Sequence, residues 1–370
     1  MLFRSDNVTA VCPEVIEAIL AVNQGDAAPY GADEVTAKLD SAFGAYFEAP
    51  VHVHPVATGI AANALSLAAA MPPPGAALCH VNAHVNTSES GAPEFFSGGG
   101  KLITLDGAHG KLDPAAIERL LASLPPDRLQ SAPPTVVTLT QGTEAGTVYA
   151  LDQIAAIAGV CHARGLVLHM DGARFENARA RLGCTPAELS WRAGVDILSY
   201  GATKNGAMCA DAVVIFRASP HAERLNRFMG QRRLRAGQVF SKMRYLSAQL
   251  LAMVETGVAA RNAAHANATA ARLAAGLGAL PGVRLIHPTE INEVFVHMPE
   301  PIRAGLAACG FPVRPRPEDP NLVRFVTAWN TRAEDVEAFL RAILENKPSP
   351  VPGEHGLILN AIFDAIYKSS

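Results

Sequence analysis

The stretch DILSYGATKNGAM (196–208) joins an apolar, strand-like run to one lysine, Lys204, set among small residues. Its glycines and asparagine are turn residues, so a surface turn after a strand would account for the pattern. The alternative is chemical, because small neighbours leave room for a bulky group on the Lys204 amine. A second stretch, LVLHMDGARFENA (166–178), favours the chemical interpretation, since it delivers Asp171 at the end of another apolar run.

Apolar runs of strand length alternate with alanine-rich helical runs through most of the chain. The strand-like runs lie at 51–57, 76–81, 101–107, 134–140, 165–171, 195–201 and 211–216. Fully apolar strands separated by helices predict an α/β fold with a mostly parallel sheet covered on both faces.

The pattern changes after residue 216. A long helical segment, roughly 236–278, is followed by three short strand-like runs, VRLIHP, NEVFVHM and LVRFVTAW. We expect a large cofactor-binding domain with an N-terminal arm at 1–250 and a small α+β domain at 251–345. The proline- and glycine-rich linker and apolar tail at 346–370 have no assigned role.

Composition excludes several classes of protein. The 370 residues are 49% hydrophobic and 18% charged, with a net charge of −3 and no long basic run. Neither nucleic acid nor a membrane surface is therefore an expected partner. No apolar stretch reaches membrane-spanning length, and no secretory signal is readable. Six scattered cysteines without a CxxC pair indicate free thiols and a cytoplasmic protein.

Asp171 and Lys204 form a pair that pyridoxal phosphate chemistry requires. A lysine holds the cofactor as an imine, and an aspartate keeps the pyridine nitrogen protonated, which makes the ring an electron sink. An aspartate at a strand end is also an ordinary turn or cap residue. A third element supports the cofactor. In HPVATGIAANALSL (54–67), Gly59 opens a helix whose first N–H groups could bind a phosphate.

Three histidines are candidate functional groups. His84 follows the run at 76–81 and could lie over a cofactor ring or take up a proton, although a histidine after a strand is also an ordinary structural residue. His52 and His54 have a spacing that could bind metal. Because no further ligand motif lies nearby, we expect no metal site.

Five runs carry a family resemblance: SDNVT (5–9), PYGADE (29–34), AHVNTSESGAPEFFS (83–97), HMDGAR (169–174) and SYGATKNG (199–206). As an ordered set they resemble the low-specificity L-threonine aldolases, a threonine aldolase and β-eliminating lyase family. The pattern is most similar to the bacterial branch that includes L-phenylserine aldolase. The resemblance extends from about residue 4 to about residue 344 and leaves the tail without a counterpart.

The resemblance implies the pyridoxal phosphate-dependent transferase fold type I, like that of aspartate aminotransferase. It implies pyridoxal 5'-phosphate as cofactor and retro-aldol cleavage of L-β-hydroxy-α-amino acids, such as L-threonine, L-allo-threonine and L-phenylserine, to glycine and an aldehyde. It also implies a homotetramer, a dimer of dimers with sites at dimer interfaces.

Site residues follow from the same resemblance. Lys204 would hold the cofactor and act in catalysis, Asp171 would pair with the pyridine nitrogen, and His84 would stack on the ring. The remaining implied residues are Gly59 and Ile60 at the phosphate, Arg174 at cofactor and substrate, Ser5 and Arg324 at the substrate carboxylate, and Tyr30 from a neighbouring subunit.

Some positions depart from the wider family. Ile60 stands where many relatives carry threonine, and Gln141 replaces a second active-site histidine. The basic residues at 232–244 do not align cleanly with those that reach a neighbour's phosphate, so none is assigned. Glu89 matches a family position without an assigned role.

We therefore expect a cytoplasmic, pyridoxal phosphate-dependent aldolase that acts on a small amino acid. An aminotransferase or β-eliminating lyase is the alternative within the same chemistry, because one fold supports many reactions. A catalytically silent binding protein is the alternative from another class, and Lys204 argues against it. The apolar run at 92–96 could border an aryl group, and we expect L-threo-phenylserine to be cleaved at least as efficiently as L-threonine. Phe95 and Phe96 could equally be core residues.

Overall fold

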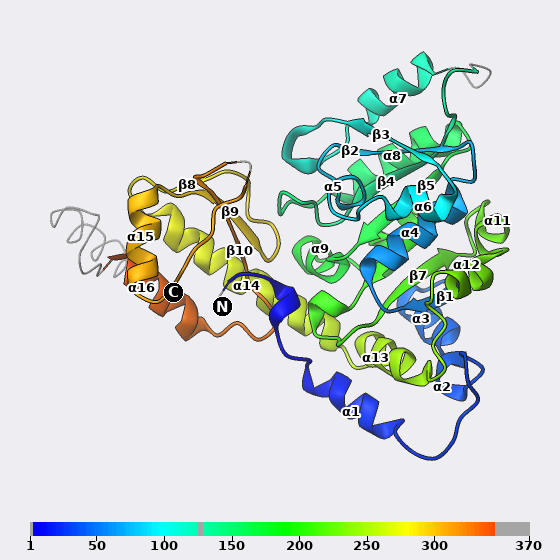
Figure 1. The fold of residues 1–370 in the computed structure, drawn as a ribbon, viewed down its shortest axis with the longest axis horizontal. Helices are drawn as coiled ribbons and strands as arrows, with labels where there is room; N and C mark the ends of the chain where they lie inside the picture. Colours follow the sequence, from blue (N-terminus) through cyan, green and yellow to red (C-terminus); the bar gives the residue numbers. More distant parts are fainter. Residues whose placement is uncertain (1–2, 125–128, 318, 345–370) are drawn as a thin grey trace. The chain divides into compact units, whose positions relative to one another are not determined.

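The computed structural model describes residues 3–124, 129–317 and 319–344 (Figure 1). These residues divide into two compact units. The large unit comprises Ala10–Glu144 and Val148–Arg261, and the small unit contains residues 3–9, 145–147 and the described chain from 262 onward. The tail expected at 346–370 lies outside the described residues. The domain bounds 1–250 and 251–345 stay a prediction beside this division.

The large unit is built on a seven-stranded sheet. Its strands are β1 (Val51–Val56), β2 (Ala76–His80), β3 (Lys101–Leu105), β4 (Pro134–Thr140), β5 (Val167–Gly172), β6 (Ile197–Gly201) and β7 (Asp211–Phe216). Their spatial order is β1-β7-β6-β5-β4-β2-β3, and β7 runs antiparallel to both of its neighbours while the remaining pairs are parallel. All seven expected strands are present, and the predicted mostly parallel α/β sheet is confirmed.

Helices separate the strands and cover the sheet (Figure 1). They are α1 (Pro13–Ala21), α2 (Glu34–Ala37), α3 (Leu39–Phe47), α4 (Gly59–Ala70), α5 (His84–Thr87), α6 (Ala92–Ser97), α7 (Pro114–Ser123), α8 (Leu151–Ala163), α9 (Phe175–Leu182), α10 (Pro186–Leu189), α11 (Ala222–Asn226), α12 (Met229–Arg235) and α13 (Arg244–Glu255). Most crossovers between parallel strands contain a helix, which is how an all-apolar strand is buried on both faces.

Helix α4 covers one face of the sheet, against β5, β6 and β7. Apolar residues of α4 such as Leu65 share a core with strand residues Val167 and Ile197. The other face carries an aromatic cluster, in which the ring of Phe47 lies 5.2 Å from Phe216 and 5.8 Å from Phe175. Side chains alternate between faces along a strand, so the sheet residues on the α4 side recur at every second position.

The small unit has its own sheet and core. Helix α14 (Val258–Gly278) leads from the large unit into three antiparallel strands in the order β10-β9-β8, with α15 (Glu300–Ala308) and α16 (Ala333–Leu344) beside them in the chain. These strands are β8 (Arg284–Leu285), β9 (Glu293–His297) and β10 (Leu322–Val326). The N-terminal segment joins this unit, because the N–H of Val326 donates to the Phe3 carbonyl at 2.8 Å.

The helical segment expected at 236–278 is interrupted in the structure. It forms two helices, α13 and α14, separated at Gly257, whose φ of +75° lies in the left-handed region. Residues with side chains rarely adopt that conformation, so glycine ends the first helix there. Residues 236–243, at the start of the expected segment, are not helical.

Candidate active site

Two adjacent strands of the large unit deliver the predicted pair of residues to one edge of the sheet. Asp171 is the next-to-last residue of β5, and Lys204 lies in the short 3-10 turn Thr203–Asn205 directly after β6. The strands are parallel, with Asp171 in register with Ser199. The carboxyl ends of parallel strands meet at the same edge, which is where open α/β sheets bind ligands.

The backbones at these strand ends approach closely. A Cβ atom added to Gly201 would lie 2.7 Å from Ala173 Cα, so no larger residue fits there. A Cβ on Gly172 would lie 2.8 Å from the Ser199 carbonyl oxygen. Packing between the strand ends therefore requires a glycine at position 201. The space that a bound group would need is a second reason for a small residue there.

Asp171 is buried with its carboxylate fixed by two donors. Its Oδ1 accepts a hydrogen bond from the Ala173 N–H at 3.0 Å, and its Oδ2 accepts one from Asn63 Nδ2 at 2.8 Å. His169, two residues earlier on the same face of β5, lies between the hydroxyls of Thr138 and Ser199. Burial lowers the pKa of His169 to about 4, so this neighbour is neutral at physiological pH.

The turn that carries Lys204 is held by a second buried aspartate, Asp211, the first residue of β7. Its Oδ1 accepts the N–H groups of Ala202 at 2.8 Å and Thr203 at 3.1 Å. Burial raises the pKa of Asp211, and the nearby charge of Lys204 acts in the opposite direction. The carboxylate of Asp211 therefore fixes the backbone of the turn that carries Lys204.

His84 lies within electrostatic range of both Asp171 and Lys204. Its Nδ1 lies 2.8 Å from Oε1 of Glu89, and its side chain is 39% exposed while that of Glu89 is fully buried. The hydrogen bond to Glu89 is the largest influence on the pKa of His84 and raises it. Burial and Lys204 lower this pKa, whereas Asp171 raises it. The structure thus brings His84, Asp171 and Lys204 into one cluster.

The first turn of α4 is the third element of the cluster. Thr58 caps the helix by accepting the Ala61 N–H at 3.1 Å, and Gly59 and Ile60 follow in its exposed first turn. The first N–H groups of a helix have no partner within the helix and carry its positive dipole end. Asn63, one turn further along, hydrogen-bonds Asp171, so this helix end belongs to the same edge of the sheet.

This donor set fits pyridoxal phosphate. A buried carboxylate suits a protonated pyridine nitrogen, a lysine in a fixed turn suits the imine, and a helix N-terminus suits the phosphate. Within the described residues, the buried atoms Asn63 Oδ1 and Glu89 Oε2 have no hydrogen-bond partner. Unpaired buried polar atoms cost free energy, so each one calls for an explanation, and a bound group is one such explanation.

The remaining predicted residues lie in both units. Arg174 follows Asp171 in the large unit as the half-buried N-cap of α9, and the exposed Tyr30 has a φ of +61°. In the small unit, Ser5 accepts the Asn7 N–H at 3.1 Å. Arg324 of β10 pairs with the buried Glu293 at 3.3 Å. The roles implied for these four residues stay predictions.

Gln141 has a structural role in the large unit. Its side-chain amide donates to the Tyr149 carbonyl and accepts the Tyr149 N–H, both at 2.9 Å. The side chain is fully buried, and its two hydrogen bonds imitate a strand pair. Both polar atoms of the glutamine side chain are satisfied by these hydrogen bonds, so Gln141 joins two backbone segments of the large unit.

The described residues offer neither a metal site nor a membrane-spanning helix. Among residues 3–124, 129–317 and 319–344, no group of three or more His, Cys, Asp or Glu side chains could hold a metal ion. His54 instead hydrogen-bonds Asn226 at 2.7 Å, and burial lowers its pKa to about 4. No helix in this described part is both long and apolar enough to cross a bilayer. All six cysteines are free.

Two residues of the cluster, Asn63 and Asp211, were missed by sequence reasoning. Asn63 lies on the buried face of a helix of small and apolar residues, where a polar side chain is unexpected. Asp211 opens an otherwise apolar strand. In both cases the signal was a polar residue in an apolar setting, but their partners lie far away in sequence.

Comparison with known structures identifies the fold. The chain superposes on the threonine aldolase of Leishmania major with a TM-score of 0.84 at 27% identity, covering 92% of this chain and 97% of that one. It superposes on an aspartate aminotransferase of Rhodobacter sphaeroides with a TM-score of 0.67 at 17% identity, covering 95% and 94%. The fold is the aspartate-aminotransferase-like fold type I of pyridoxal phosphate enzymes, as expected.

Sequence comparison identifies the family to which the chain belongs. The family model of the β-eliminating lyases matches residues 3–301. A low specificity L-threonine aldolase of a Pseudomonas species is 41% identical over 345 residues, which cover 92% of this chain and 97% of that protein. The protein of the same description from Pseudomonas aeruginosa is 42% identical over 341 residues, covering 92% and 96%. The chain belongs to the β-eliminating lyase family, and the predicted enzyme class, a lyase, is confirmed.

Proposed function

We propose that this chain is a pyridoxal phosphate-dependent aldolase that cleaves L-threonine and related L-β-hydroxy-α-amino acids to glycine and an aldehyde. The cluster of Lys204, Asp171 and His84 at the start of α4 is the observation that carries the proposal. The names of the Pseudomonas and Leishmania relatives support it.

In this proposal, Lys204 and Asp171 hold the cofactor with the first turn of α4. The bound cofactor supplies an electron sink that stabilises the carbanion left at the substrate Cα. Asp171 keeps the pyridine nitrogen protonated, because an adjacent carboxylate favours the charged form of that group. Gly59 and Ile60 offer backbone N–H groups to the phosphate. The Ile60 side chain cannot donate a hydrogen bond, so main-chain N–H groups and the helix dipole would bind the phosphate.

His84 is proposed to accept the proton of the β-hydroxyl group, with stacking on the cofactor ring as the alternative role. When the Cα–Cβ bond breaks, the hydroxyl proton passes to the imidazole and Cβ becomes the aldehyde carbon. Cα then takes up a proton and becomes the methylene carbon of glycine. The ring is 39% exposed and contacts Glu89 through Nδ1, so Nε2 is the nitrogen proposed to face the substrate. A positioned general base of this kind typically contributes ~10²–10⁴-fold.

Arg174 of the large unit is proposed to bind the substrate carboxylate, and for Arg324 and Ser5 of the small unit the same role is proposed from the family resemblance. Guanidinium groups bind carboxylates through paired, charge-assisted hydrogen bonds, which fix orientation as well as position. Fixing the carboxylate would orient the substrate Cα and so select the bond that is cleaved. Glu293 already holds the Arg324 guanidinium at 3.3 Å, so a bound carboxylate would share this arginine with it.

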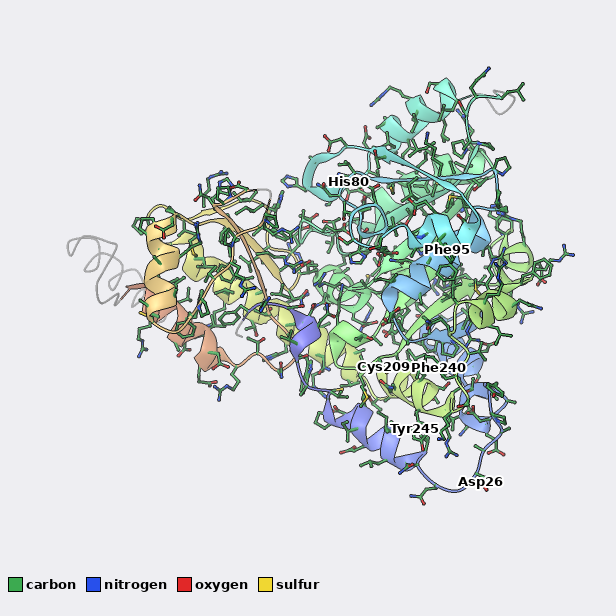
Figure 2. The ribbon with its side chains drawn as sticks, viewed as in Figure 1. Asp26, His80, Phe95, Cys209, Phe240 and Tyr245 are labelled. Carbon is green, nitrogen blue, oxygen red and sulfur yellow. The ribbon has the colours of Figure 1, made fainter. Side chains whose placement is uncertain are left out.

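The preferred substituent on Cβ is proposed to be aromatic. Phe95 on α6 (labelled in Figure 2) is not a core residue, because its side chain is 78% exposed. Its ring packs edge-on against Phe96 at 5.1 Å between centroids. We infer from the exposed Phe95 ring on α6 an aryl-binding surface, which Tyr30 of a second subunit would complete. L-threo-phenylserine, L-threonine and L-allo-threonine are the proposed substrates.

The assembly is proposed to be a homotetramer in the cytoplasm. Tyr30 is 64% exposed, and its N–H donates to the Ser241 carbonyl at 3.2 Å, which presents the ring outward on an ordered turn. Free thiols throughout the chain agree with a reducing compartment. Light scattering of the purified protein measures the assembly, and a monomeric mass would contradict it.

Steady-state kinetics on a substrate panel tests the proposed function. We expect release of glycine with benzaldehyde from L-threo-phenylserine and with acetaldehyde from L-threonine, and kcat/KM for phenylserine at or above that for threonine. A clear preference for threonine would refute the aryl surface and leave the aldolase standing. Cleavage of neither substrate would refute the aldolase itself.

An aminotransferase or a β-eliminating lyase is the second candidate, and the family match is the observation that favours it. The same incubations discriminate between these reactions. Transamination consumes a keto acid and returns its amino acid, and β-elimination from serine releases ammonia and pyruvate. We expect neither product at a rate near that of aldehyde release.

A further inference from the structure

The side chain of Glu89 is fully buried, whereas that of its neighbour His84 is partly exposed. The two residues belong to one short segment, since His84 begins α5 and Glu89 follows in the turn before α6. Glu89 Oε1 lies 2.8 Å from His84 Nδ1. Burying a carboxylate is unfavourable unless donors compensate it, so the contact with the imidazole is a principal reason that this glutamate can be buried.

Asn63 supplies the second donor and links Glu89 to Asp171. Its Nδ2 lies 2.8 Å from Glu89 Oε1 and 2.8 Å from Asp171 Oδ2. An amide that meets two carboxylates must present its NH₂ group to both, since its oxygen would be repelled. The amide orientation is therefore fixed, and a chain of hydrogen bonds runs from His84 through Glu89 and Asn63 to Asp171.

We propose that Glu89 is a positioning residue that holds the His84 imidazole with its proton on Nδ1 and leaves Nε2 as the basic nitrogen on the open edge. The inference rests on the proposed function, in which that nitrogen takes the hydroxyl proton. A carboxylate beside Nδ1 accepts a hydrogen bond only from the N–H form, so the tautomer of the neutral ring follows from the contact.

The charges around the ring support this assignment. Glu89 is the largest influence that raises the pKa of His84, Asp171 acts in the same direction, and Lys204 opposes them. Glu144 also reaches this residue, but its carboxylate accepts the backbone N–H of His84 at 2.8 Å and so holds the chain. Burial raises the pKa of Glu89 itself. A neutral Glu89 would donate to Nδ1 and force the opposite tautomer, which makes the proposal testable.

Nitrogen NMR of the full-length protein labelled with ¹⁵N-histidine tests it, with and without pyridoxal phosphate. The His84 signals are assigned by their loss in His84→Phe. At a pH above the pKa of His84, we expect Nδ1 to be protonated and Nε2 unprotonated. Protonation of Nε2 instead would overturn the proposal.

Glu89→Gln gives the second readout. The amide oxygen can still accept from His84 and Asn63, but the charge is gone, so the pKa of His84 should fall by about one unit or more. The acidic limb of kcat/KM should move to lower pH by the same amount. Glu144→Gln is the matched control, in which the tautomer and the pKa of His84 should stay unchanged. An unchanged pKa in Glu89→Gln would overturn the proposal.

Two further variants keep the test decisive. If Glu89→Gln does not fold, Glu89→Asp draws the carboxylate away from Nδ1 and should lower the pKa of His84 by a smaller amount; no change there would count against the proposal equally. His84→Phe separates this inference from the proposed function. A high rate of cleavage in His84→Phe would refute the base role, while the tautomer and pKa results would still decide whether Glu89 sets the state of the ring.

Discussion

Asp171 and Asp196 are two buried aspartates at opposite ends of the parallel strands. Asp171 lies near the carboxyl end of β5, and Asp196 lies just before the amino end of β6. Asp196 accepts hydrogen bonds from the Leu168 N–H at 2.7 Å, from His162 Nε2 at 3.1 Å and from Ser219 Oγ. Both of its oxygens are therefore satisfied by groups that join neighbouring elements.

The Asp171 end is incomplete by comparison. Its carboxylate is held by Ala173 and Asn63, but polar atoms of Asn63 and Glu89 are buried without a partner in the described chain. A histidine near a buried aspartate is thus a poor marker of a reaction site taken alone. The lysine and the unpaired atoms of Asn63 and Glu89 make the Asp171 end the proposed reaction site, and the fully paired Asp196 end is proposed to contribute to stability.

Replacing Lys204 with Ala gives the largest expected effect. Turnover and the visible absorbance of bound cofactor should both be lost, because no other group in the cluster can form the imine. Activity assays and absorbance spectra measure the outcome. Lys101→Ala, which changes an exposed lysine of β3, is the control and should behave like the wild type. Wild-type turnover in Lys204→Ala would remove the distinction between the two ends.

Asp171→Asn and Asp196→Asn test the comparison as a pair. Asp171→Asn should lower kcat by about 10²–10³-fold, the size typical of losing one preorganised electrostatic partner, and should cost less stability than Asp196→Asn, because Asp171 accepts from two donors and Asp196 from three. Asp196→Asn should lower the free energy of unfolding by about 1–3 kcal/mol, since buried donors lose their acceptor, while the folded protein keeps its kcat. Denaturant titrations and kinetics on both variants decide this. The reverse pattern would show that the two ends were assigned wrongly.

His169, between the two ends, gives the smallest expected effect. Its pKa is lowered by burial to about 4, so the unfolded chain binds a proton below pH of about 6.5 before the folded one does. The free energy of unfolding should fall as pH drops from about 6.5 to about 4, by up to about 3 kcal/mol for a shift of this size. Denaturation at several pH values should show a shallower fall in His169→Gln. An equally steep fall in His169→Gln would show that another group, for instance His54, causes the loss of stability at acidic pH.

Much of the sheet could be predicted from sequence because its signals are local. Apolar runs of strand length and turn residues identified all seven strands, and they placed Asp171 and Lys204 at strand ends. The break at Gly257 was missed because alanine-rich sequence on both sides favours helix, and a single glycine is tolerated within many helices.

The support of the site could not be predicted because its contacts are distant in sequence. Asn63 meets Asp171 across 108 positions, and that contact requires α4 to lie over β5. Glu89 is close to His84 in sequence, but its burial depends on Asn63 as well. Residues 3–9 fold with the small unit, which no local pattern indicates.

Gly172 and Gly201 have a consequence for anyone who would redesign this enzyme. Neither residue has a side chain that could contact a substrate. A directed-evolution library that varies the residues around the proposed site could therefore include both without a clear reason to spare them. The close approach at these glycines sets the spacing of the strand ends that carry Asp171 and Lys204. We expect them to be the least mutable positions near the site, so libraries should hold both constant and place their diversity on α6.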